Sequence, residues 1–132
     1  MNKSKKGFTV LELIVCIVFL GIFVVLFFMQ YQNIEAMQRD EKRKVAINAI
    51  YYSLEEGYYA EHGYYPEKIT SAEDLPWMDP NLLSDPYGNN IWVVGGDYSY
   101  ESSNCNDEGQ CKEYTLRATL EQEAEYVKSN RN

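Results

Sequence analysis

The chain has 132 residues and a formal net charge of −8, from 20 acidic and 12 basic side chains. This length allows one small domain beside a long apolar segment, which is too little for a large buried catalytic cleft. The acidic balance disfavours a nucleic-acid-binding surface, which needs a basic stripe. One histidine, and no nucleophile motif or phosphate-binding loop, argue against catalysis, so we expect neither an enzyme nor a bound cofactor.

The N-terminus combines a basic start with a long apolar run. Residues 1–7, M-N-K-S-K-K-G, carry three lysines, and Phe8–Met29 is almost wholly apolar. As a helix this run would extend roughly 33 Å, enough to cross the hydrocarbon core of a bilayer. Lysines beside such a helix stay on the cytoplasmic side, so we expect residues 30–132 outside. No small-x-small cleavage site follows Met29, which disfavours a secretory signal peptide.

Glu12 is the single charge within the apolar run. A carboxylate at the centre of a membrane helix costs on the order of 2–3 kcal/mol, so we expect it to have a partner. A monomeric single-pass anchored protein explains every feature of this region except Glu12.

The residues K-K-G-F-T-V-L-E-L-I, positions 5–14, resemble the processing site and mature N-terminus of type IV pilins and pseudopilins. The resemblance implies cleavage between Gly7 and Phe8 by a prepilin peptidase, and N-methylation of Phe8. It also implies that Glu12 pairs with the N-terminal amine of a neighbouring subunit. Residues 1–7 would then be a leader peptide, 8–30 a helix that lies first in the membrane and later in the filament core, and 31–132 a globular pilin domain.

Electrostatics agrees with this pairing. An amine and a carboxylate in apolar surroundings attract strongly, and either one alone is costly. A straight helix carries Glu12 four residues away from its own amine, so a subunit shifted along the filament axis offers a better partner. The implied partners are identical subunits, the peptidase and an inner-membrane assembly platform, with no direct nucleic-acid binding. The implied location is the bacterial cytoplasmic membrane for the precursor and a cell-surface filament afterwards.

The segment from Gln30 to His62 has no proline, and its apolar residues recur mostly every three or four positions. This pattern predicts an amphipathic helix continuous with the apolar run, Phe8–His62, with Gly63 as its C-cap. The mixed charges of R-D-E-K-R-K, Arg39–Lys44, predict a solvated or inter-subunit face.

The C-terminal half predicts a small α+β domain. Ser71–Leu75 reads as one helical turn with a capping box, and Asp85–Asn90 as a turn cluster. Three antiparallel strands lying on the long helix are expected at Ile91–Val94, Tyr98–Ser102 and Glu113–Leu120. We expect core positions in the preceding loop at Leu75, Trp77, Leu82 and Leu83. The final residues, from Glu121, fit either a short helix or a frayed tail.

Three cysteines divide into two kinds. Cys16, within the apolar run, acts as a small hydrophobe. Cys105 and Cys111 lie close together in a polar loop, which predicts a short disulfide formed outside the cytoplasm. Asp107 and Glu108 in that loop are a weak calcium candidate, because their spacing matches neither an EF-hand nor the late-loop site of major pseudopilins. We therefore expect no metal.

The expected function is a structural subunit of a type IV pilus or pilus-like filament that supports motility, adhesion or DNA uptake. The D-P-Y-G turn resembles that of pseudopilins, whereas the long loop and the cysteine pair favour a surface pilus. A pseudopilin of a type II secretion system is thus an alternative. A monomeric anchored surface protein is the alternative from a different class.

Overall fold

A computed structural model describes residues 7–131, and the chain divides after Glu35 into two compact units. Helix α1 (Val10–Tyr52) continues through a π-helical turn (Ser53–Tyr58) into α2 (Tyr59–His62). Gly63 ends the helix in the left-handed conformation, with φ 76°, and its N–H donates to the carbonyl of Tyr59 over 2.7 Å. The predicted helix and its glycine cap are confirmed, and the π-helical turn is an addition.

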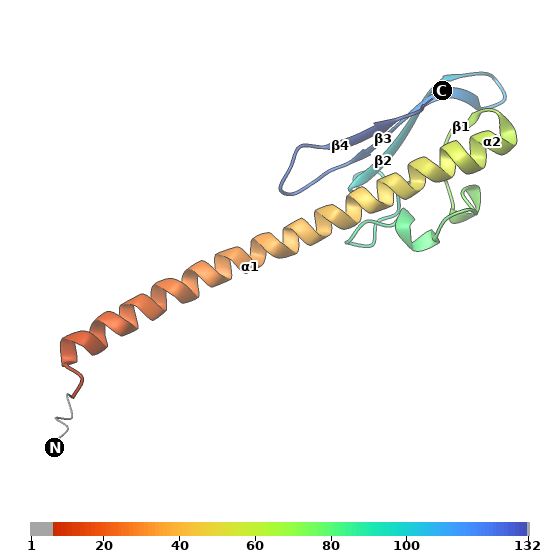
Figure 1. The fold of residues 1–132 in the computed structure, drawn as a ribbon. Helices are drawn as coiled ribbons and strands as arrows, with labels where there is room; N and C mark the ends of the chain where they lie inside the picture. The colour runs from red at the N-terminus through yellow and green to blue at the C-terminus, as the bar shows by residue number, and fades with distance from the viewer. Residues whose placement is uncertain (1–6, 132) are drawn as a thin grey trace. The chain divides into compact units, whose positions relative to one another are not determined.

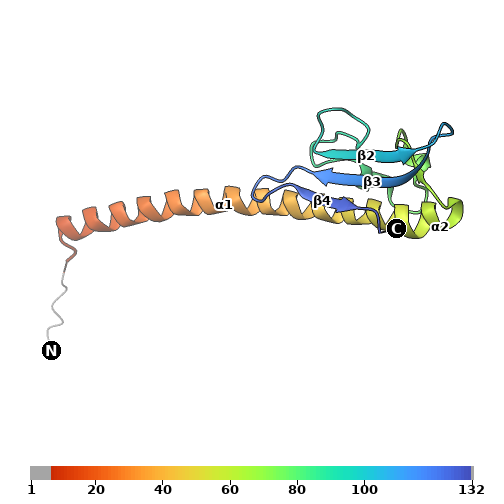
Figure 2. The same cartoon turned by 90° about the horizontal axis from the view of Figure 1, so that it is seen from above.

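From Ala36 onward, a four-stranded antiparallel sheet lies along the yellow part of the helix (Figure 1). The strands are β1 (Tyr65–Pro66), β2 (Tyr98–Cys105), β3 (Gln110–Ala118) and β4 (Tyr126–Ser129). Strand β3 is central, with β2 on one edge and β4 on the other (Figure 2). The short β1 pairs with the start of β3, on the edge opposite β2. The α+β class is therefore confirmed.

The predicted count of three strands is wrong in two places. Residues Ile91–Val94 form turns instead of a strand, with the Val93 N–H donating to the Asn90 carbonyl over 2.9 Å. The two glycines that follow allow the chain to curl, so that Ile91 is buried while Val93 and Val94 are exposed. The final residues, expected as a short helix or a frayed tail, instead supply β4, because the edge of β3 at Thr115–Ala118 accepts another strand.

The core lies between the helix and one face of the sheet. Strand β3 alternates buried and exposed residues as a half-covered strand should, with Tyr114, Leu116 and Ala118 facing inward. The other side chains of this core come from the helix, the loops and the ends of β1, β2 and β3: Ala46, Ile47, Ile50, Leu54, Tyr65, Ile69, Leu75, Leu83, Ile91, Tyr98 and Cys111. Leu75 and Leu83 thus confirm the predicted loop contribution to the core, and Leu82 is half-buried.

Trp77 is 45% exposed, so its predicted core position is wrong. Its ring packs on the helix at Gly57, where an added Cβ would meet ring carbons at 2.8 Å. The loop turns that were predicted are present: Ser71 and Asp74 form a capping box, and Asp85 accepts the N–H groups of Tyr87 and Asn89.

Asp40 and Arg43 are buried, so the expectation of a solvated or inter-subunit face at Arg39–Lys44 is wrong for these two residues. The Arg43 guanidinium bonds Asp40 at 2.8 Å, Asp97 at 2.7 Å and Glu121 at 2.9 Å. Asp40 also accepts the backbone N–H of Glu121 and of Gln122. We call Asp40, Arg43, Asp97 and Glu121 the ionic network. It joins α1 to the loop before β2 and to the chain after β3.

The pKa values of two network carboxyls, those of Asp40 and Glu121, lie below their usual values. Burial raises the pKa of Asp40, but the two backbone N–H groups and Arg43 together outweigh that effect. Hydrogen bonds from Arg39 and then Arg43 lower the pKa of Glu121 from 4.5 to about 2. Both groups are therefore ionised in the folded protein at neutral pH.

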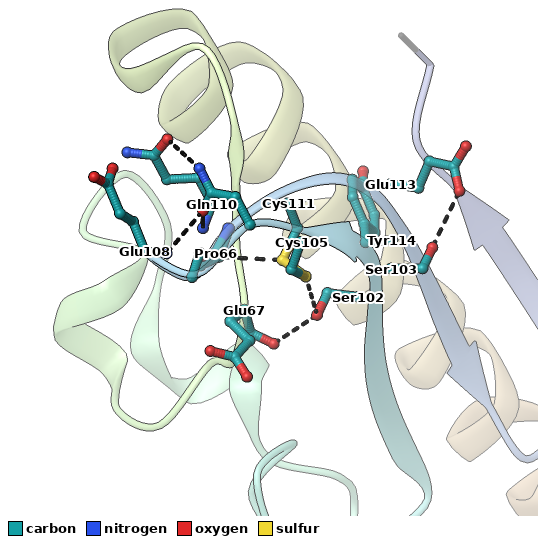
Figure 3. The surroundings of a disulfide bond; sticks show 12 residues. Pro66, Glu67, Ser102, Ser103, Cys105, Glu108, Gln110, Cys111, Glu113 and Tyr114 are labelled. Atoms are coloured by element: carbon teal, nitrogen blue, oxygen red, sulfur yellow. Dashed lines mark hydrogen bonds between the residues drawn. A yellow bond between two sulfur atoms is a disulfide. The ribbon is translucent and has the colours of Figure 1, made fainter.

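The predicted disulfide between Cys105 and Cys111 is present (Figure 3). The two cysteines face each other across β2 and β3, just before the hairpin tip. Beside them, the Ser102 hydroxyl donates to the Glu67 carbonyl over 2.8 Å, which fastens the segment after β1 to β2 (Figure 3).

Replacing Arg43 should destabilise the globular unit strongly. In Arg43→Met, the buried carboxylate of Asp40 loses its cation, and breaking such a pair costs about 3 kcal/mol or more. Thermal unfolding of the full chain in detergent, followed by near-ultraviolet circular dichroism, measures the loss. Lys42→Met, one position away on an exposed side chain, is the matched control and should leave Tm unchanged. Equal Tm values for the two variants would contradict the role assigned to the network.

Acid should destabilise the same unit. The folded pKa of Glu121 is below its unfolded value, so its contribution is complete above about pH 4.5 and is lost as the pH falls towards about 2. We expect Tm to fall across this window and to fall less steeply in Glu121→Gln. Identical slopes for the variant and the wild type would show that Glu121 is not a source of the acid sensitivity.

Removing the disulfide should have a moderate effect. A loop with a sequence separation of 6 is closed by the bond, and the loss of such a cross-link costs about 2 kcal/mol. Cys105→Ser combined with Cys111→Ala should lower Tm by about 10 °C. Cys16→Ser, which removes the free cysteine, serves as control. An unchanged Tm in the double variant would show that the bond does not stabilise the fold.

Candidate functional site

The first unit begins with a capped helix. The Thr9 hydroxyl accepts the Glu12 N–H over 3.2 Å, and the Thr9 carbonyl accepts the Leu13 N–H over 3.1 Å. The spacing Thr-x-x-Glu is that of a capping box, and the hydroxyl half of it is formed here. Gly7 and Phe8 precede the first turn and are exposed, which leaves the bond between them open to an enzyme.

The helix of this unit is apolar all round. Every residue from Gly7 to Glu35 is exposed, and an 18-residue window of the helix has a mean hydropathy of 3.2. It is therefore long and apolar enough to cross a membrane. Its exposed side chains include phenylalanines at positions 19, 23, 27 and 28, among leucines, isoleucines and valines. A surface of this size is stable only against lipid or against other apolar surfaces.

Glu12 lies in the first turn of this helix. A carboxylate there is favoured by the positive end of the helix dipole, by about 0.3–1 kcal/mol at an exposed site. Such a gain offsets only part of the cost of placing the charge in a hydrocarbon environment. A cation from outside the helix, paired with Glu12, would offset the rest of this free-energy cost. The arrangement can thus hold one positive group in an otherwise apolar surface.

The other predicted site residues lie in the second unit. Cys105 and Cys111 form their disulfide, and Asp107 and Glu108 are exposed at the hairpin tip. The Asn106 side-chain oxygen is occupied by the N–H groups of Glu108 and Gln110. Among residues 7–131, no group of three or more His, Cys, Asp or Glu side chains is arranged to hold a metal ion. The three lysines of the expected leader, in residues 1–6, lie outside the described residues.

Two polar clusters, each built around buried charged side chains, escaped the sequence-based prediction. One is the ionic network. The other surrounds Glu55, whose carboxylate accepts the hydroxyls of Tyr114 at 2.8 Å and Tyr65 at 3.1 Å. Burial and then the bond to Glu55 raise the pKa of Tyr114 above its usual value. The rings of these two tyrosines pack edge to face in the core, with their centroids 4.7 Å apart.

The burial of Asp40 and Arg43 could have been predicted from the sequence. They continue, at spacings of three and four, the buried stripe formed by Ala36, Ile47, Ile50 and Leu54. Extending that stripe backwards along the helix would have predicted that both side chains face the core. The burial of Glu55 could not be predicted from spacing, because the π-helical turn changes the helical period at this position.

Comparisons with protein-family models, with curated proteins and with solved structures give no match for this chain.

Proposed function

We propose that this chain is a structural subunit of a type IV pilus or a pilus-like filament, anchored in the membrane by its apolar helix before assembly. The observation that carries the proposal is one carboxylate, Glu12, in the first turn of a helix that is otherwise apolar and exposed as far as Met29. Gly7 and Phe8 stand immediately before that turn, as in the prepilins that the sequence resembles.

The pairing of charges gives the proposal its mechanism. Cleavage after Gly7 would create a positive amine on Phe8, at the edge of the same apolar surface. A neighbouring subunit displaced along the filament axis would bring this amine to Glu12 and neutralise both groups. Because attraction between charges grows as the dielectric constant falls, the pair would also fix the axial register of the subunits.

The surface of the helix fits two successive environments. An apolar face on one side only would suit a helix lying on a core or on a membrane surface. An apolar surface on every side suits first the lipid and then a bundle of identical helices. A monomeric anchored protein would use the first environment alone and would leave Glu12 without a role.

Substitution of Gly7 should block maturation. In Gly7→Val, a branched side chain next to the scissile bond should stop cleavage, so that the full-length precursor accumulates in the membrane and no filaments form. Intact mass spectrometry measures the N-terminus: wild-type material should begin at Phe8 and the variant at Met1. Wild-type material beginning at Met1 would contradict the proposal.

Substitution of Glu12 should separate maturation from assembly. Glu12→Leu removes the partner for the amine of the next subunit but leaves Gly7 and Phe8 intact, so we expect normal cleavage with no filaments in electron micrographs. Glu12→Asp, which keeps the charge but shortens the side chain, should restore part of the filament yield. Normal filaments from Glu12→Leu would refute a role for this carboxylate in assembly.

A further inference from the structure

A pocket of about 420 Å³ opens on the second unit, between the end of the long helix and the loop that follows β1. Its helical wall contains Tyr52 and Glu56, and its loop wall contains Trp77 and Asp79. The rest of the lining is mainly apolar and includes Ala49, Met78 and Leu82. The volume lies within the range of small-molecule sites. We call this cavity the Trp77 pocket.

Two aromatic side chains of the pocket are packed against the fold and still open to solvent. Gly57 lets the Trp77 ring rest directly on the helix, because an added Cβ would lie 2.8 Å from ring carbons. Tyr58 meets the same ring edge-on, with centroids 6.3 Å apart. The Tyr52 ring packs edge-on against Tyr51, with centroids 5.3 Å apart. Trp77 is nonetheless 45% exposed and Tyr52 57% exposed, so both can contact a ligand.

Two carboxylates lie in the same lining. Glu56 pairs with Arg131 through its Oε1 atom, and Asp79 accepts the Asn81 N–H through its Oδ1 atom over 3.0 Å. Each of these contacts engages one oxygen, so the second oxygen of each carboxylate can accept from a ligand. Two acidic groups and one basic group leave a negative balance at the pocket. The net charge of −8 on the chain adds a longer-range attraction for cations.

Aromatic rings and carboxylates together select a particular kind of ligand. The face of a tyrosine or tryptophan ring attracts an ammonium group that lies within about 6 Å of the ring centroid. The apolar part of the lining suits methyl or methylene groups attached to that nitrogen. A metal ion is a poor fit, since within residues 7–131 no three His, Cys, Asp or Glu side chains are arranged to hold one. Anions would be repelled by the carboxylates.

We propose that the Trp77 pocket binds an alkylammonium cation. The positive nitrogen would lie against the rings of Tyr52 and Trp77. The carboxylates of Glu56 and Asp79 would balance its charge, and its alkyl groups would contact the apolar lining. This class includes the quaternary ammonium of choline and the side chain of lysine. The site goes beyond the proposed function and does not depend on it, because every residue involved belongs to one copy of the second unit.

Tryptophan fluorescence tests this binding. The chain has two tryptophans, so in a Trp92→Phe background the emission reports on Trp77 alone. The full chain is kept in a polyoxyethylene detergent, which carries neither sugar nor ammonium groups. Choline chloride at constant ionic strength should change the emission saturably, with half-saturation below about 10 mM. The matched neutral probe is 3,3-dimethyl-1-butanol, which has the shape of choline without its charge and should give no saturable change.

Variants of the lining identify the groups that bind the cation. Glu56→Gln and Asp79→Asn should each raise the half-saturating choline concentration about fivefold or more, because each removes one attractive charge. Asparagine at position 79 can still cap the following turn. Tyr52→Leu, which keeps the wall apolar but removes the ring, should have an effect of similar size. Asp107→Asn, at the exposed hairpin tip and outside the lining, is the matched control and should bind choline normally.

The neutral probe and the carboxylate variants decide the outcome. Equal responses to choline and to 3,3-dimethyl-1-butanol would show an apolar site without cation selectivity, and would overturn the proposal. Unchanged choline binding in both carboxylate variants would overturn it as well, as would a response to glucose with none to choline. N-acetyl-lysine methylamide, titrated in parallel, shows whether a lysine side chain binds more tightly than choline. None of these results bears on filament formation, because the titrations use unassembled protein.

Discussion

The apolar helix from Val10 to Met29 has nothing within its own unit to cover it, and the rest of the molecule has to be understood from that constraint. Hydrophobic burial stabilises by about 25 cal/mol per Å², so an exposed apolar helix of this length is driven into lipid or against other helices. Glu12 lies on the same apolar surface, and apolar side chains or lipid cannot neutralise its charge. A filament of identical subunits would satisfy both demands at once, since every neighbour brings an apolar helix and, after processing, a positive amine.

In the second unit, the main structural requirement is to hold long loops against a small sheet. Its core is modest, and the ionic network joins the helix to two distant segments through Arg43. Buried charges contribute little net stability but tolerate few alternative arrangements. The network therefore serves chiefly to position the loop that ends at Asp97. That loop carries the exposed Val94.

Local chemistry made much of this fold predictable. The glycine cap at Gly63, the capping box at Ser71 and the facing cysteines follow from short-range rules, and all are confirmed. Long-range pairing was not predictable. Ile91–Val94 has the composition of a strand but curls, whereas the acidic C-terminus, with little pattern, becomes β4 because β3 offers a free edge. At the candidate site, Glu12 was identified because a charge in an apolar run is conspicuous, whereas the burial of Glu55 in the second unit depends on tertiary packing.

The central claim is that Glu12 contacts the Phe8 amine of another subunit. Electron cryomicroscopy of filaments sheared from cells tests it most directly, because side-chain density in the filament core identifies the neighbours of each carboxylate. The account predicts density joining Glu12 of one subunit to the N-terminal nitrogen of Phe8 in the adjacent subunit. A filament in which Glu12 faces solvent, or bonds a group within its own subunit, would contradict it.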